Sequence, residues 1–333
     1  MQIQKLKKLI SKILLKYNLN KKDAEICTKA LINAELVGAP SHGVSRLKMY
    51  CERINKKVIN PKPKIKIKRV TNSVSLINAD NSIGFVAADT GIKETIKIAK
   101  KTGIAFVGIK NSGHYGLSGY YIEQAVKKNL LAFAFTNAPP AIAPHGGKKT
   151  IFGTNPICFG SPTNNNIPFI LDTSMSMINR GKIRVAAKLN KSIPKGVALD
   201  KFGKQTTNAK DALSGVQLPI ASFRGSGLAW MVDILTGVFV GSAHSGKVKD
   251  PFDDFRGPQN IGHLFIAFKN NLFVKNFKQQ IKVNINRIKN IPKLKGEKIY
   301  YPGERKFFRK KLNSKKTIKI PSSIKKDLDN LLS

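Results

Sequence analysis

The segment Ile104-Ala105-Phe106-Val107-Gly108-Ile109-Lys110-Asn111-Ser112-Gly113-His114-Tyr115-Gly116 carries the clearest structural signal in this chain. Residues 104–109 form a short apolar run, which predicts a buried strand. His114 follows that strand in a glycine-rich loop, and a helix is expected next, around residues 120–128. Loops at strand ends are where α/β proteins carry their chemistry, and histidine is the side chain that titrates near neutral pH. We therefore expect a functional site at His114.

A second histidine has a similar glycine-flanked setting. His42, in Ser41-His42-Gly43, follows a helix that is expected to end near Gly38. If the next segment is helical, His42, Arg46 and Tyr50 lie on one face. A base, a guanidinium that can pair with a carboxylate and a phenol together predict a pocket for a small acid. The alternatives are a solvent-facing helix and, for either histidine alone, a structural loop residue.

Helices and strands are expected to alternate along most of the chain, which indicates an α/β protein. We expect helices over residues 3–17, 20–38, 85–100, 120–128 and 228–240, strands near 65–67, 74–77, 104–109, 131–135, 169–172 and 264–268, and a polar surface excursion over 195–207. Phe223-Arg224-Gly225-Ser226-Gly227 opens the helix at 228 and is a candidate anion site. Neither the G-x-G-x-x-G nor the G-x-x-x-x-G-K-[ST] nucleotide fingerprint is present.

Size and composition exclude several classes of protein. The 333 residues allow a large core and more than one domain. The longest apolar segment, 227–241, is interrupted by Asp233 and is shorter than the roughly 20 residues of a membrane span. The N-terminus has lysines among its apolar residues, so we expect no secretory signal. The three cysteines have no paired spacing, so we expect neither a disulfide framework nor a metal site. Reduced cysteines indicate a cytoplasmic location.

The formal net charge of +40 arises from 59 Lys and Arg against 19 Asp and Glu. Such a charge can indicate a polyanionic partner. However, the lysines are spread over the whole chain, and no nucleic-acid-binding motif, basic tail or aromatic-interleaved stripe accompanies them. We therefore expect no specific nucleic-acid partner, and only weak adhesion to polyanions at low salt.

Several ordered blocks make this chain resemble the malate/L-lactate dehydrogenase family of the LDH2/MDH2 type, whose relatives include sulfolactate, ureidoglycolate and cyclic-imino-acid oxidoreductases. The blocks are Ser41-His42-Gly43-Val44-Ser45-Arg46, Asn111–Gly116, Ala143-Pro144-His145-Gly146-Gly147, Phe152-Gly153-Thr154-Asn155-Pro156, Leu171-Asp172-Thr173-Ser174, Arg224-Gly225-Ser226-Gly227-Leu228 and Tyr301-Pro302-Gly303-Glu304-Arg305. They span more than 250 residues. The resemblance implies an α/β fold of the family's own, non-Rossmann type, with a mixed sheet, a helical N-terminal region and an interlocking homodimer. It also implies a terminal helical domain with the substrate pocket, residues 1–70 plus 270–333, and a central α/β cofactor-binding domain, residues 71–269.

The resemblance implies roles for particular residues. His114 resembles the catalytic acid/base, which exchanges a proton with the substrate while the cofactor exchanges hydride. The implied substrate-binding residues are Ser41, His42, Arg46, Tyr50 and Asn155, and the implied cofactor-binding residues are Asn137, Ala138, Asp172, Thr173, Ser174, Arg224, Gly303, Glu304 and Arg305. Two positions depart from the family pattern: Arg224 replaces a common Lys, and Ala138 replaces a common Ser. For Asp172, the alternative to a cofactor contact is that it caps a helix. His145 and His263 are left outside the site as structural candidates.

The resemblance implies an NAD- or NADP-dependent oxidoreductase that interconverts a small 2-hydroxy acid and its 2-oxo acid. Malate, lactate and sulfolactate are the candidate acids. One alternative is a reductase of cyclic imino acids such as piperideine-2-carboxylate or pyrroline-2-carboxylate, in which His114 exchanges its proton with the imine nitrogen. The other is a basic nucleic-acid-binding protein on an inactive dehydrogenase fold, which predicts salt-sensitive binding without turnover.

Overall fold

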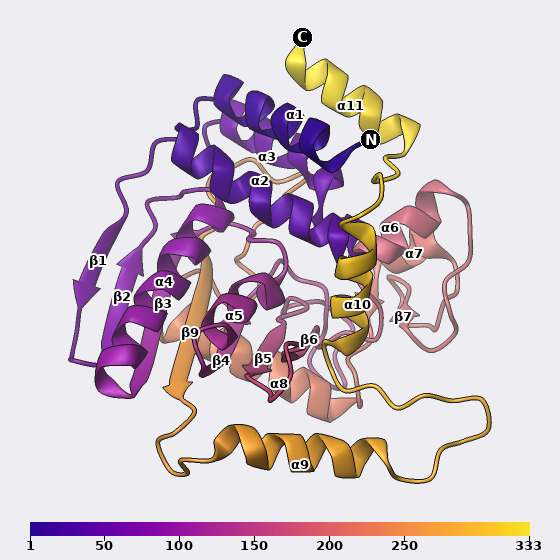
Figure 1. Ribbon diagram of the computed structural model, residues 1–333. Coiled ribbons are helices and arrows are strands. Elements are labelled where there is room, and N and C mark those ends of the chain that lie inside the picture. The colour runs from indigo at the N-terminus through magenta and orange to yellow at the C-terminus, as the bar shows by residue number, and fades with distance from the viewer.

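A mixed sheet of seven strands forms the centre of the computed structural model, which describes residues 1–333 (Figure 1). In spatial order the strands are β1 (Lys66–Arg69), β2 (Val74–Asn78), β3 (Ile104–Ser112), β9 (Ile261–Lys269), β4 (Leu130–Thr136), β5 (Ile157–Ser161) and β6 (Phe169–Thr173). Only β2 and β3 run parallel; every other neighbouring pair is antiparallel. The expected mixed sheet is confirmed.

Both faces of the central strands are covered. In β3, Ala105, Val107 and Ile109 belong to a buried cluster with helices α4 (Gly84–Thr102) and α5 (Ser118–Val126). The intervening residues face α8 (Phe223–Asp233) and the π-helix Ile234–Val238 that continues it, on the other side of the sheet (Figure 1). Because successive side chains of a strand alternate between faces, such a strand is apolar throughout. This explains the unbroken apolar run at residues 104–109.

The ladder between β3 and β9 ends at an irregularity that redirects the chain. The register shifts between Ile109 and Ser112, and Asn111 adopts a φ of 55°. A bulge of this kind bends a strand at its end. The chain therefore leaves the sheet at Ser112 and turns towards the N-terminal helices, where His114 lies.

The N-terminal region is helical, as expected. It consists of α1 (Ile3–Lys16), α2 (Lys21–Leu36) and α3 (Leu47–Asn55), which pack with the C-terminal α11 (Ser322–Leu332). Asn20 caps α2, because its side chain accepts a hydrogen bond from the N–H of Asp23 at 2.9 Å. These helices enclose one buried cluster and the sheet with α4 and α5 encloses another. The first cluster also includes Ile83, Phe85 and Val86 of the central region, and the division into a terminal and a central domain stays a prediction.

Three segments differ from the expectations. His42, Arg46 and Tyr50 do not lie on one helix: the 3-10 turns Pro40–His42 and Val44–Arg46 precede α3. Helix α8 begins at Phe223, five residues before the expected start, and Gly225 in its first turn packs so closely on Ile220 that a Cβ would lie 1.9 Å from the Ile220 carbonyl oxygen. The excursion 195–207, expected as a polar surface segment, contains the strand β7 (Ala198–Leu199), which pairs with β8 (Val216–Gln217). Together with α6 (Arg180–Lys188) and α7 (Ala209–Ser214), this segment encloses a small buried core.

Helices α9 (Phe277–Lys289) and α10 (Glu304–Asn313) complete the chain. Figure 1 shows α10 running beside the sheet on the way from α9 to α11. No helix has both the length and the apolar character needed to cross a membrane.

Candidate active site

His114 and Tyr50 form the centre of the site. Tyr50 Oη lies 2.6 Å from His114 Nδ1 and also donates a hydrogen bond to the His114 carbonyl oxygen at 3.2 Å. The N–H of Gly116 also lies 3.4 Å from Nδ1 as a donor, so Nδ1 can act as acceptor or as donor. In the tautomer in which the Tyr50 hydroxyl hydrogen points to the carbonyl, Nδ1–H donates to Oη and Nε2 carries a lone pair. Nε2 has no hydrogen-bond partner within the protein. The contact with Tyr50 therefore presents Nε2 as the reactive nitrogen.

Two residues that sequence reasoning missed hold the His114 loop in place. Gln259 Oε1 accepts a hydrogen bond from the backbone N–H of His114 at 3.3 Å. Gly84, the first residue of α4, packs so closely that a Cβ there would lie 2.2 Å from the carbonyl oxygen of Gly113. Neither residue lies near His114 in the sequence, and no local pattern at residues 84 or 259 indicates this role.

His42 stacks beside His114. Their ring centroids are 5.8 Å apart with an interplanar angle of 27°, and Ser41 Oγ lies 3.0 Å from His42 Nδ1. The turn that carries His42 is fixed by Glu35, whose carboxylate accepts a hydrogen bond from the N–H of Val44 at 2.8 Å. Gly43 is required there, because a Cβ would lie 2.1 Å from the Glu35 Oε1 atom. The structure thus brings together the two histidines that the sequence singles out.

Arg46 brings an unpaired cation to the same place. Its Nε donates a hydrogen bond to the Ser41 carbonyl oxygen at 2.7 Å, and its guanidinium lies 4.8 Å from the centroid of the Phe252 ring. No carboxylate lies within ion-pair distance of this side chain. A partly buried guanidinium whose terminal nitrogens are free is suited to bidentate capture of a carboxylate or another oxyanion.

Both histidines of the site are neutral near pH 7. Burial holds the pKa of His114 well below its ordinary value, and the nearby cation Arg46 lowers it further. Burial also lowers the pKa of His42 to about 4, with smaller contributions from Arg46 and Lys306. Neutral imidazoles beside an unpaired cation leave the site with a base and with an excess of positive charge.

Asp172 and Gly303 lie together, next to Lys306, on another side of the site. Asp172 Oδ2 accepts a hydrogen bond from the N–H of Gly119 in the first turn of α5 at 3.0 Å. This bond satisfies a helix-start N–H, and the role of Asp172 towards the cofactor stays a prediction. Its carboxylate lies 3.8 Å from Lys306 Nζ. Gly303 has a φ of 94° and begins α10 against residues 168–170 of the sheet edge. All three residues line a narrow cavity of about 50 Å³ that also reaches Leu117, three residues after His114.

Asn137 and Asn155 use their side chains inside the protein. Asn155 is fully buried; its Oδ1 accepts a hydrogen bond from the N–H of Ala138 at 3.1 Å and its Nδ2 donates one to the Ala229 carbonyl oxygen at 2.7 Å. Asn137 Nδ2 donates to the carbonyl oxygen of Ala243 at 2.6 Å, and its Oδ1 accepts from Gly262 at 3.0 Å. These amides hold the loop after β4 and present no free polar atom. A polar residue in a glycine- and proline-rich loop gives the same sequence pattern whether it binds a ligand or holds the loop.

The remaining candidate cofactor residues are dispersed. Arg224 is exposed in the first turn of α8, where its guanidinium lies over Phe223. Glu304 is buried in an ion pair with Lys289, while Arg305 is exposed over Tyr300. Thr173 and Ser174 are partly buried at the end of β6, and their hydroxyls bond to neighbouring residues. No hydrogen bond or ion pair joins Arg224 or Arg305 to Asp172 or to His114.

The two histidines left outside the site lie elsewhere. His263 is fully buried in β9, where Thr136 Oγ1 lies 2.7 Å from Nδ1 and Ser112 Oγ lies 2.8 Å from Nε2. It links the ends of three adjacent strands. His145 is exposed, 3.4 Å from the Ser222 hydroxyl.

Fold and site together define an α/β protein in which a mixed sheet presents a neutral histidine to an electropositive site. The chain belongs to the malate/L-lactate dehydrogenase family, whose model matches residues 1–329. It is thus an oxidoreductase of that family, and the absence of the Rossmann fingerprint is explained.

Relatives with assigned names support this membership. The chain is 35% identical over 328 residues to a malate/(S)-sulfolactate dehydrogenase of Methanothermus fervidus, covering 97% of this chain and 94% of that protein. It is 37% identical over 248 residues to a (2R)-3-sulfolactate dehydrogenase (NADP+) of Chromohalobacter salexigens, covering 74% of each. A ureidoglycolate dehydrogenase (NAD+) of Escherichia coli K12 is 32% identical over 304 residues, covering 90% of this chain and 86% of that protein.

Solved structures show the same fold. A sulfolactate dehydrogenase from Methanocaldococcus jannaschii superposes with a TM-score of 0.92 at 33% identity, covering 99% of this chain and 96% of that one. A malate dehydrogenase from Pyrococcus horikoshii gives a TM-score of 0.90 at 32% identity, covering 99% and 94%. The expected family fold is confirmed.

Proposed function

We propose that this protein is an NAD(P)-dependent oxidoreductase that interconverts a small 2-hydroxy acid and its 2-oxo acid. The observation that carries this proposal is the pairing of a neutral His114, with Nε2 free, and Arg46, a cation without a carboxylate partner. A 2-hydroxy acid needs both groups, because its carboxylate must be held while its hydroxyl loses a proton. The names of the relatives support this substrate class.

In the proposed mechanism, Arg46 binds the substrate carboxylate and His114 handles the proton. During oxidation, His114 Nε2 takes the hydroxyl proton; during reduction, it returns a proton to the carbonyl oxygen. Nicotinamide supplies or accepts the hydride when it is bound. Tyr50 holds the tautomer of His114 through Nδ1, and Ser41 orients His42 as a pocket wall. Asn155 acts by positioning the Ala138 backbone and not by contacting the acid.

The residues around Gly303 fit a dinucleotide. A left-handed glycine opens α10 with no side-chain cap on its first N–H groups, and Lys306 stands one turn further along, beside Asp172. A helix start without a side-chain cap and an adjacent cation suit phosphate oxygens. We propose that the cofactor is held here, with Thr173, Ser174 and Arg305 at its edges and Asn137 supporting the nearby loop. Arg224 is proposed as a further phosphate contact.

We also propose that the protein forms a homodimer through the outer face of α8 and the following π-helix. Trp230, Val238 and Phe239 are more than half exposed there. Large apolar side chains gathered on one exposed face are typical of a subunit interface. The three cysteines are free and buried, which supports the proposed cytoplasmic location.

A substrate panel tests the proposal. Oxidation of NADH and of NADPH is followed with oxaloacetate, pyruvate, 3-sulfopyruvate and piperideine-2-carboxylate, each at more than one salt concentration. The proposal expects turnover with at least one 2-oxo acid. Turnover with the imino acid alone would favour the reductase alternative, and no turnover combined with salt-sensitive binding of DNA or RNA would favour the nucleic-acid-binding alternative.

A further inference from the structure

The ring of Phe252 is shared by two guanidinium groups. The Cζ atom of Arg46 lies 4.8 Å from the ring centroid, and the Cζ atom of Arg184 lies 4.1 Å from it. Both distances are within the roughly 6 Å at which an aromatic face attracts a cation. The two arginines come from different parts of the fold, the 3-10 turn before α3 and helix α6. Phe252 therefore connects Arg46 to a segment that is distant from it in the sequence.

Arg184 and Asp250 hold the ring in place. Asp250 Oδ2 lies 3.1 Å from a guanidinium nitrogen of Arg184, and Asp250 Oδ1 accepts a hydrogen bond from the N–H of Phe252 at 2.9 Å. The charge of Arg184 is thus balanced by a carboxylate two residues before the ring. Arg46 has no carboxylate partner. The two cations therefore differ: Arg184 anchors the ring, and Arg46 is free to bind an anion.

Arg53 fixes the segment around the ring from α3. Its side chain is fully buried and donates hydrogen bonds to the carbonyl oxygens of Asp254 at 2.9 Å and of Gly257 at 3.2 Å. A buried cation is costly unless other groups bind it in this way. Tyr50, three residues earlier on the same helix, contacts His114. Helix α3 thus sets both the orientation of the imidazole and the position of the segment that carries the ring.

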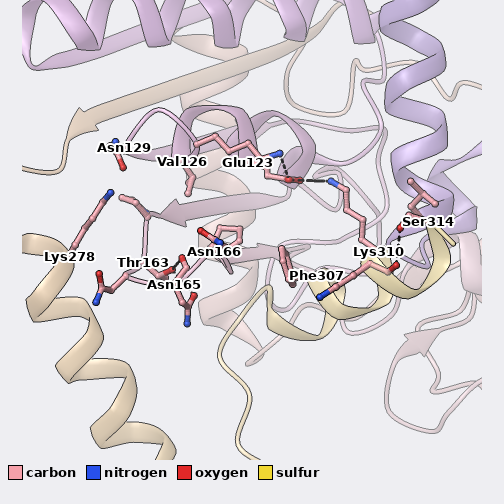
Figure 2. Close-up of a pocket in the computed structure, with 16 residues that line it drawn as sticks. Glu123, Val126, Asn129, Thr163, Asn165, Asn166, Lys278, Phe307, Lys310 and Ser314 are labelled. Carbon is pink, nitrogen blue, oxygen red and sulfur yellow. Dashed lines mark hydrogen bonds and ion pairs between the residues drawn. The ribbon is translucent and has the colours of Figure 1, made fainter.

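Two directed contacts set the plane of the Arg46 guanidinium: the Phe252 ring and the hydrogen bond from Nε to the Ser41 carbonyl oxygen at 2.7 Å. The wide cavities of the protein do not enclose this side chain. One of about 590 Å³ lies between α5, α9 and α10 (Figure 2), another of about 600 Å³ adjoins residues 143–148, and Arg46 lines neither. A guanidinium that lies over a ring keeps its N–H edges free for bidentate pairing. The ring therefore supplies an orientation that the bond at Nε alone leaves open.

We propose that Phe252 is a positioning residue for Arg46, and that its ring holds the guanidinium so that both terminal nitrogens face the substrate carboxylate. This inference rests on the proposed function, in which Arg46 binds that carboxylate. It makes the affinity for the acid depend on an aromatic face at position 252 and not on the volume of the side chain. The ring has no part in the proton transfer at His114, so kcat should not depend on it.

Phe252→Leu tests the inference, because leucine keeps an apolar side chain and removes the aromatic face. The measurements are KM and kcat for the best 2-oxo acid of the panel, and the dissociation constant of oxalate, determined by calorimetry with NADH or NADPH bound. We expect KM and the dissociation constant each to rise by about 3- to 30-fold, the range of a cation–π contact, with kcat within about twofold of wild type. Phe252→Tyr should recover the affinity, since its ring offers the same face. Phe252→Met replaces the leucine variant if thermal unfolding shows that variant to be unfolded.

The Arg46→Gln background shows whether the ring acts through Arg46. In that background, Phe252→Leu should add no further rise in the dissociation constant of oxalate, because the cation that the ring positions is already absent. Phe202→Leu removes an exposed ring that lies beside Lys201, and as the control it should leave oxalate binding unchanged.

Three results would overturn the inference: an unchanged dissociation constant in Phe252→Leu, equal losses in Phe252→Leu and Phe252→Tyr, or a full further loss in the Arg46→Gln background. If Arg46→Gln weakens oxalate binding and Phe252→Leu does not, the proposed function stands and the inference fails. If Arg46→Gln binds oxalate and the 2-oxo acid as the wild type does, the proposed binding of the acid by Arg46 fails, and the inference fails with it.

Discussion

The hydroxyl of Tyr50 lies 2.6 Å from Nδ1 of His114, although the two residues are 64 positions apart in the sequence. Tyr50 belongs to α3 of the N-terminal helical region, and His114 belongs to the loop that follows the central strand β3. This one contact therefore joins the N-terminal helical region to the loop that carries the imidazole. It makes the orientation of the imidazole depend on the packing of the helices against the sheet.

Tyr50→Phe removes the hydrogen bond to Nδ1 and leaves the aromatic packing against Phe85 in place. We expect kcat to fall by about 10- to 100-fold, because a misoriented base loses its near-attack geometry. KM for the acid should change much less, since Arg46 is untouched. Steady-state kinetics provide the measurement, with Tyr17→Phe, at the residue that follows α1, as the matched control. A variant in which KM rises and kcat is unchanged would show that Tyr50 contacts the substrate instead.

Arg46→Gln removes the only unpaired cation next to both histidines. We expect KM for the acid to rise by about 10- to 100-fold, the value of a charge-assisted pair to a carboxylate. Arg256→Gln, a surface arginine paired with Asp254, is the control and should leave KM unchanged. An unchanged KM in Arg46→Gln would place the carboxylate elsewhere.

The same substitution should change the pH dependence in a defined direction. Oxidation needs neutral His114, so kcat/KM for the hydroxy acid falls as the pH drops through the pKa of His114 in the free enzyme. Arg46 lowers that pKa, so its removal raises the pKa and moves the acidic fall to higher pH. Profiles of kcat/KM, recorded from pH 8 down to the lowest pH at which both proteins stay folded, measure this shift. A fall at lower pH in the variant would contradict the assigned electrostatics.

His263 should make the protein less stable in mild acid. Burial lowers its pKa to about 3, whereas an unfolded histidine has a pKa near 6.5. Between these values the unfolded chain binds one more proton, so the stabilisation is complete above pH 6.5 and is lost as the pH falls, at about 1.4 kcal/mol per pH unit. Urea unfolding at pH 6.0 and 5.0 should show a smaller loss in His263→Gln by that amount. His145→Gln should lose stability as the wild type does.

Asn155→Ala should destabilise the fold. The substitution removes the side-chain hydrogen bonds to the Ala138 N–H and to the Ala229 carbonyl oxygen inside the protein, so we expect the free energy of unfolding to fall by about 1–3 kcal/mol. Asn286→Ala on the exposed side of α9 is the control. Unchanged stability together with a large rise in KM would identify Asn155 as a direct substrate contact.

Local patterns were sufficient to predict most elements and part of the site. The apolar run at 104–109 became β3, and the Asn20 cap was predicted from its own sequence neighbourhood. The proximity of His42, Arg46 and Tyr50 was also expected from their spacing, although 3-10 turns and not one helix produce it, and only the family resemblance implied that His114 joins them. Short-range signals suffice where the structure depends on neighbouring residues.

The pairing of strands that are distant in the chain and the burial of single residues could not be predicted from the sequence. Strand β9 lies between β3 and β4, although the chain places it more than 120 residues after β4, and no local feature at 261–269 encodes those partners. Gln259 and Gly84 support His114 from distant segments for the same reason. The family resemblance implies ligand contacts for Asn155 and Asn137, and only their burial reveals that backbone groups already use their amides. Their ligand contacts stay predictions.

The central claim is that His114 carries the proton in a hydride-transfer reaction. Its most direct test is kcat for cofactor oxidation by His114→Ala with the best 2-oxo acid of the panel, together with the dissociation constant of the cofactor. We expect kcat to fall by about 10²- to 10⁴-fold, the usual contribution of a general acid/base, with cofactor binding within about twofold of wild type. Wild-type activity in His114→Ala would contradict the account.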